Sequence, residues 1–137
     1  MRNLKSTKVF ISAARPNQTL TETALAHDGL RIALESSSHL EAVREVAGCF
    51  DGNLEPAFCV FVRPGHILEA IDACVIFASA WDQESVLVVH GDDAAELCET
   101  ETDCSAIIGT FTRLPDGVKP EPGEDYTLAD SIYYVVR

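Results

Sequence analysis

Basic residues are scarce in this chain of 137 residues, which has 10 Lys and Arg against 22 Asp and Glu and a net charge of -12. Binding to nucleic-acid phosphates requires clustered basic side chains, so the composition argues against a nucleic-acid partner. A negative field does concentrate cationic small molecules. An excess of carboxylates also keeps a protein soluble, and charge alone favours that plainer interpretation. Mimicry of DNA is a weaker alternative, because the acidic residues are scattered apart from a mild cluster at 92–103.

Long apolar runs are absent as well. No segment is apolar over the length needed to cross a bilayer, and the first 17 residues lack the charged, apolar and small-residue parts of a signal peptide. We therefore expect a cytoplasmic protein without a membrane partner. The length and the hydrophobic content of 47% predict a single domain over residues 1–137. Residues 1–6 are polar, and we expect them to be frayed.

Motifs for metals and activated nucleophiles are also missing. The five cysteines are an odd number with no C-x-x-C pair, which predicts reduced thiols rather than disulfides or a zinc site. We expect no metal and no cofactor, because no histidine has a second ligand three or four residues away. The chain has no P-loop, no dinucleotide fingerprint and no G-x-S-x-G elbow, and nothing supports a Ser-His-Asp triad. The isolated histidines are His27, His39, His66 and His90.

The clearest local pattern is a helix followed by a strand over residues 65–90. Apolar residues recur at helical spacing after Pro64, and a β-branched run at 85–90 ends at Gly91, which is typical of a buried strand. The helical stripe consists of Ile67, Ile71, Cys74, Val75, Ala78 and Trp81.

The rest of the chain has weaker signals for strands and one further helix. Thr19 and Glu22 have the spacing of a capping box and predict a helix over about 20–36, in which Gly29 is either a kink or a point of close approach. We predict strands at 8–14, 40–50, 57–62, 105–111 and 132–136, and a short acidic helix at 92–98.

This order of elements predicts an α+β fold of the ferredoxin-like type, an α/β sandwich with an open antiparallel sheet and both main helices on one face. The uncovered face would need a partner. We therefore expect an oligomer whose interfaces hold the ligand sites.

Few side chains stand out as candidates for chemistry, and each has a plainer interpretation. Ser12 and Arg15 follow the first strand, where they could equally be an outward side chain and a partner of a carboxylate. Glu69 lies off the apolar stripe, where most glutamates are merely solvated. Trp81 is more typical of a core residue than of a ligand platform.

Five short segments, taken in order, resemble the small phage enzymes that degrade S-adenosylmethionine. These S-adenosylmethionine lyases, formerly called hydrolases, include the enzyme that phages use against restriction-modification. The similarity is clearest over residues 8–90. The matching segments are Val9-Phe10 with Ser12-Ala13-Ala14-Arg15, the helical His27, Gly48-Cys49-Phe50, Trp81-Asp82-Gln83 with Val86-Leu87-Val88, and Tyr126-Thr127-Leu128.

The resemblance implies a homotrimer of PII-like, ferredoxin-like subunits with active sites between subunits. It implies cleavage of S-adenosylmethionine to 5′-methylthioadenosine. The substrate carboxylate can displace the thioether and close homoserine lactone, and this needs only correct folding of the substrate and exclusion of water. If water attacks instead, the product is homoserine and a base is required. The alternatives are a non-catalytic PII-like binder of an adenine ligand and an acidic, DNA-mimicking anti-restriction protein.

Glu69 is the residue that we expect to act in catalysis. It follows the segment 63–66, which could line a cleft between subunits, and its carboxylate could hold the sulfonium or the ammonium of the substrate. The residues expected to bind the substrate are Ser12, Arg15, His27, Phe58, His66 and Trp81.

Overall fold

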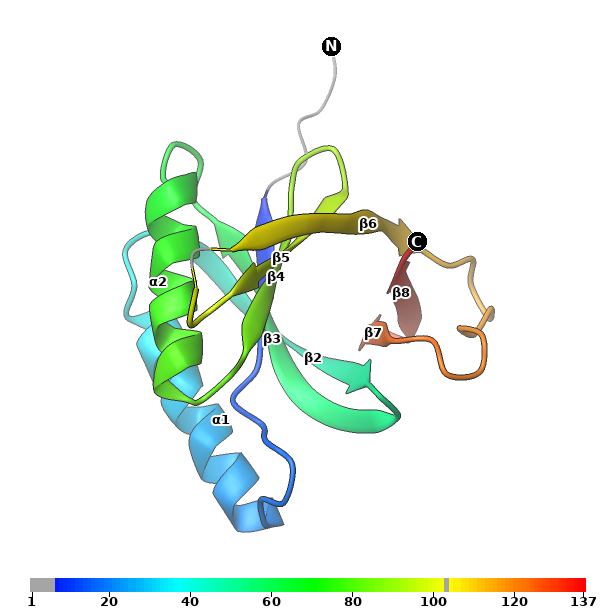
Figure 1. Ribbon diagram of the computed structural model, residues 1–137, viewed down its shortest axis with the longest axis horizontal. Helices are drawn as coiled ribbons and strands as arrows, with labels where there is room; N and C mark the ends of the chain where they lie inside the picture. The colour runs from blue at the N-terminus through cyan, green and yellow to red at the C-terminus, as the bar shows by residue number, and fades with distance from the viewer. Residues whose placement is uncertain (1–6, 103) are drawn as a thin grey trace.

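The computed structural model describes residues 7–102 and 104–137, and the predicted fraying of residues 1–6 lies outside this range. Within it, the strands form one closed antiparallel barrel in the order β1-β3-β2-β7-β8-β6-β5-β4, and two helices lie on its outside (Figure 1). The strands are β1 (Lys8–Ile11), β2 (Leu40–Phe50), β3 (Asn53–Val62), β4 (Ser85–Val89), β5 (Ala94–Glu99), β6 (Ser105–Arg113), β7 (Tyr126–Ala129) and β8 (Ile132–Val136); the helices are α1 (Leu20–Glu35) and α2 (Ile67–Ala80).

The two main helices are confirmed close to their predicted limits. At the start of α1, the Thr19 hydroxyl accepts a hydrogen bond from the Glu22 amide at 3.1 Å, and the Glu22 carboxylate accepts one from the Thr19 amide at 2.9 Å. A Cβ added to Gly29 would lie 3.0 Å from the ring of Trp81. Gly29 is therefore a point of close approach between α1 and the end of α2.

The predicted ferredoxin-like sandwich with an open sheet is wrong, because the second half of the chain closes the sheet. The segment predicted as a short acidic helix is instead strand β5, and β7 was not predicted. Strand β5 pairs with β4, β7 pairs with β2, and β8 joins β7 to β6. A tight turn links β7 to β8 through Asp130 and Ser131, which have φ angles of 51° and 66°.

The barrel wall separates two apolar clusters, because alternate residues of each strand face opposite sides. Residues of β1 and β3 such as Val9, Phe58 and Val60 pack outward against α1 and α2. Their neighbours Phe10, Cys59 and Phe61 face the barrel interior. The sheet face that was predicted to be exposed is therefore the inner face of the barrel. The expectation of an oligomer that covers an exposed sheet face loses its basis.

All five cysteines are free, as predicted. Burial raises the pKa of Cys59 to about 11 and that of Cys74 to about 12, so both remain protonated at neutral pH. Among the residues described, neither helix combines the length and the apolar content that a membrane span requires.

Candidate functional site

A cleft of about 900 Å³ opens at one end of the barrel. Its volume is within the range of about 300–1,000 Å³ that is typical of small-molecule sites. The segment after β1, the β2–β3 hairpin, the α2–β4 turn and the start of β7 form its walls. Four of the segments with the family resemblance therefore meet here, although they are far apart in the sequence. The residues used below are Ser12, Arg15, Phe50, Glu55, Asp82 and Tyr126.

Two turns at the cleft are tied together by side chains. The Arg15 guanidinium donates to the Asp82 carboxylate at 3.0 Å, and the Gln83 amide donates to the carbonyl oxygen of Ala14 at 2.9 Å. Asp82 has a φ of 57°, a left-handed conformation that ends α2 sharply. These contacts hold the Trp81-Asp82-Gln83 segment against the segment that ends in Arg15.

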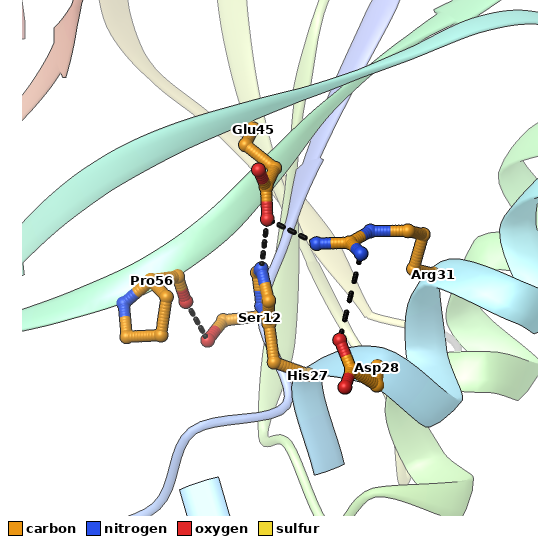
Figure 2. A network of polar contacts seen from close by, with 6 residues as sticks. All are labelled: Ser12, His27, Asp28, Arg31, Glu45 and Pro56. Atoms are coloured by element: carbon orange, nitrogen blue, oxygen red, sulfur yellow. Dashed lines mark hydrogen bonds and ion pairs between the residues drawn. The ribbon is translucent and has the colours of Figure 1, made fainter. Parts of the chain in front are cut away.

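Ser12 connects β1 to the start of β3 (Figure 2). Its hydroxyl donates to the carbonyl oxygen of Pro56 at 2.9 Å and accepts from the Ala14 amide at 3.0 Å. The residue is 8% exposed. Ser12 thus holds the backbone beside Glu55 in place, while it also lines the cleft.

Glu55 is a cleft residue that the sequence analysis missed. It lies opposite Gly48 in the β2–β3 register and is half-buried. Burial raises the pKa of its carboxyl group, and an interaction with the Ser12 hydroxyl opposes this rise. Ala57 and Cys59 face the barrel interior, and Glu55, two residues before Ala57, lies on the same face of the strand. The sequence analysis did not find it, because Pro56 is typical of a residue outside a strand and the predicted strand begins at Ala57.

Gly48 makes room for an aromatic side chain at the cleft. A Cβ added to Gly48 would lie 2.8 Å from the Phe50 ring, so the glycine allows this ring to fold back over its own strand. Phe50 is 43% exposed and lines the cleft, as does the half-buried Tyr126. These rings offer apolar faces for a ligand with an aromatic base or a positive charge.

The cleft lining is strongly acidic. One basic residue, Arg15, belongs to it, and its ion pair with Asp82 uses that charge. Glu124 is neutralised by Arg137 at 3.0 Å. The remaining carboxylates make the cleft attractive to cations. Within the described residues, no three His, Cys, Asp or Glu side chains gather as potential metal ligands. The acidic lining residues are Asp51, Glu55, Asp82, Glu84, Glu124 and Asp125.

Two of the residues predicted to bind substrate, His27 and Phe58, lie together behind the barrel wall instead; Figure 2 shows His27 with its polar partner Glu45. The His27 ring stacks on Phe58 with 4.1 Å between centroids, and its Nε2 lies 2.9 Å from Glu45 Oε1. Arg31 binds the same carboxylate, and the hydrogen bond from His27 is the main reason for the lowered pKa of Glu45. His27 and Phe58 are buried between α1 and β3 and do not belong to the cleft lining.

The other predicted residues also lie outside this cleft. Trp81 packs between α2 and Gly29. Glu69 is exposed in the first turn of α2, and the helix from Glu69 to the cleft residue Asp82 spans about 20 Å. His66 is exposed beside His39, with 5.4 Å between ring centroids. The cleft of one chain therefore brings together Ser12 and Arg15 from the predicted set.

The comparison with protein families agrees with the resemblance of the short segments. The model of the S-Adenosylmethionine lyase family matches residues 9–137, which include every strand from β2 to β8 and both helices. No curated protein gives a significant match to the chain. Because the match covers nearly the whole sequence, this protein belongs to the S-adenosylmethionine lyase family.

Proposed function

We propose that the cleft binds S-adenosylmethionine and cleaves it to 5′-methylthioadenosine and homoserine lactone. A carboxylate oxygen of the substrate forms a bond to its own γ-carbon, the carbon–sulfur bond breaks, and the electron pair stays on sulfur as a neutral thioether. The observation that carries this proposal is the half-buried Glu55 in an acidic cleft built from the family-like segments.

Recognition of the substrate follows from its charges. The substrate carries a sulfonium and an ammonium, and the Glu55 carboxylate is the group best placed in the cleft to hold one of them. Removal from water strengthens such a pairing. The rings of Phe50 and Tyr126 supply faces for the adenine or the sulfonium. A folded substrate held in this way has its carboxylate near its γ-carbon, which is the geometry that the reaction needs.

Ser12 and Arg15 support this arrangement in different ways. Ser12 positions Glu55 through the backbone of Pro56. Arg15 is the basic side chain of the cleft lining, so it is the partner for the substrate carboxylate. Binding the substrate in this way would weaken the ion pair between Arg15 and Asp82.

A homotrimer is part of the proposal, since exposed apolar side chains on the outer faces of α1 and α2 offer a surface for other subunits. These are Leu25, Ile32, Leu68 and Ile76. In a trimer, the exposed Glu69 and His66 of one subunit would complete the cleft of another. His27, Phe58 and Trp81 would act by supporting the wall behind it. Light scattering that finds a monomer at micromolar concentration would contradict this part.

The biological role that we propose is removal of S-adenosylmethionine from the cytoplasm of a phage-infected host, which deprives restriction-modification enzymes of their cofactor. The hydrolytic alternative gives homoserine and would use Glu55, with its raised pKa, as the base.

The test is incubation of the purified protein with S-adenosylmethionine, with both products followed by NMR from the first minutes. We expect 5′-methylthioadenosine and lactone to appear together. Homoserine that forms before any lactone would replace the lyase reaction by hydrolysis. Unchanged substrate would favour the non-catalytic binder.

A further inference from the structure

The barrel interior contains a second, smaller pocket that adjoins the cleft and shares part of its lining, including Phe111, Thr127 and Tyr134. Its volume is about 70 Å³, and Lys8 and Arg44 are its basic residues. Lys8 begins β1, whereas Ser12 at the cleft follows the end of the same strand. The register places Lys8 opposite Phe61 and Arg44 opposite Cys59, so all four side chains belong to the inner face of the sheet. We call Lys8, Arg44, Phe111, Thr127 and Tyr134 the basic pocket.

The charges of the basic pocket are only partly compensated. Arg44 lies at the mouth and pairs with Asp130 at 3.1 Å. Lys8 is half-buried, and among the described residues no carboxylate lies within ion-pair distance of its ammonium, which sits 5.3 Å from the centre of the Phe111 ring. A cation withdrawn from water into an aromatic wall is costly unless an anion or hydrogen-bond acceptors accompany it.

Hydroxyl groups are available beside these cations. Thr127 lines the basic pocket, and its hydroxyl is not among the buried side-chain atoms that lack a partner within residues 7–102 and 104–137, so it is open to a ligand or to solvent. Tyr134 lines the same space, with its ring stacked on Phe111. Each hydroxyl group can donate a hydrogen bond to an acceptor that lies between the two cations.

We propose that the basic pocket binds a small oxyanion, either inorganic phosphate or a free carboxylate. The Lys8 ammonium and the Arg44 guanidinium flank the anion, and the hydroxyls of Thr127 and Tyr134 donate to it. Asp130 competes for Arg44 from the β7–β8 turn and so limits the affinity. This site does not depend on the proposed reaction, since it can be measured without S-adenosylmethionine.

The experiment measures thermal unfolding of the full chain in phosphate, in acetate and in chloride at equal ionic strength. A ligand that binds only the folded state raises the unfolding temperature with its concentration. We expect a rise in phosphate, in acetate or in both relative to chloride, and the pattern identifies the source of the anion. Lys8→Met should raise the half-saturating concentration about tenfold or more, because it removes a charge-assisted contact.

The matched control is Lys119→Met, which removes the same charge from an exposed loop and should keep the wild-type response. Asp130→Asn should lower the half-saturating concentration, since it releases Arg44. Equal behaviour of chloride and both oxyanions in the wild type would overturn the proposal, as would an undiminished response in Lys8→Met. If Lys8→Met does not fold, Asp130→Asn decides: an unchanged half-saturating concentration overturns the site.

Discussion

The cleft and the basic pocket adjoin in the barrel interior and share part of their lining, but they differ in the sign of their charge. At the cleft, six acidic side chains surround one arginine, and the half-buried Glu55 has a raised pKa. At the basic pocket, Lys8 and Arg44 line a smaller space, and no carboxylate of the described residues lies within ion-pair distance of Lys8. One wall thus carries two environments a few residues apart, because a strand advances about 3.3 Å per residue and sends alternate side chains inward.

This difference shows that the net charge of -12 says little about any one site. The acidic excess was compatible with a cationic ligand, and the cleft has the matching charge. The same composition gave no reason to expect an anion site. Pairing of distant strands placed two of the few basic residues side by side.

Among the variants that test the difference between the acidic cleft and the basic pocket, Glu55→Gln is expected to have the largest effect on activity. Loss of this carboxylate should reduce kcat/KM for S-adenosylmethionine about 100-fold, since a charge-assisted contact in a partly desolvated cleft is removed. In the lactonising reaction most of the loss should appear in KM, whereas a base in hydrolysis would lose kcat. Steady-state kinetics make the distinction. Glu41→Gln, on an exposed part of β2, serves as the matched control.

Glu69→Gln should be assayed in the same series. An effect on KM comparable to that of Glu55→Gln would support the contribution of a second subunit to the cleft. Wild-type kinetics in this variant would instead leave Glu69 as an ordinary solvated glutamate, and the cleft of one chain would account for binding.

Closure of the barrel brings β6 against the C-terminal strand, and Gly109→Ala tests this contact. Gly109 has a φ of 152°, and an added Cβ would lie 2.9 Å from the carbonyl oxygen of Arg137. We expect a loss of about 2 kcal/mol in the free energy of unfolding, measured by urea denaturation. Gly117→Ala shares the positive φ but has open space, so it should lose less. Equal losses in both variants would argue against close packing of β6 on the C-terminal strand.

A smaller effect is expected for Arg15→Met. The ion pair with Asp82 is half-exposed, so the free energy of unfolding should change by less than about 1 kcal/mol. The KM for S-adenosylmethionine should rise roughly tenfold, because the substrate carboxylate loses its basic partner. Asp82→Asn is the informative companion, since it frees Arg15 and should not raise KM. A parallel rise in both variants would mean that the ion pair itself shapes the cleft.

The smallest effect concerns pH and contrasts Glu55 with Glu45. The pKa of Glu55 is raised, so the folded state holds its proton more tightly and this carboxyl group costs stability as pH rises past its ordinary value. The pKa of Glu45 is lowered, so its stabilising contribution is present at neutral pH and is lost as pH falls through the lowered value.

Glu55→Gln should therefore leave the free energy of unfolding at pH 7 unchanged or raise it by less than about 1 kcal/mol, a figure reduced for partial exposure. Glu45→Gln should lower it slightly. Denaturation at pH 7 and at pH 3 provides the check, since both differences should shrink at pH 3, where carboxyl groups are protonated. A loss of stability in Glu55→Gln together with a gain in Glu45→Gln at pH 7 would contradict the assigned environments.

Prediction from the sequence succeeded where the signal was local. The capping box at Thr19 and Glu22 placed the start of α1, and the apolar stripe through Cys74 and Ala78 placed α2, because hydrogen bonds and periodicity within one segment determine both. Strand β5 was misread, since a short run with glutamates at 96 and 99 does not distinguish a helix from a strand until its pairing partners are known.

The sequence by itself determined the two helices, most of the strands, the reduced cysteines, and membership of the S-adenosylmethionine lyase family, which the family match confirms. Ser12 and Arg15 were also recognised beforehand as candidates at the end of β1. The tertiary structure alone decided the closure of the barrel, the place of Glu55 opposite Gly48, and the position of Lys8 beside Arg44. These features depend on which strands pair and in what register. The residues of one strand do not show which distant strand it will pair with, so the sequence of each segment alone could not predict them.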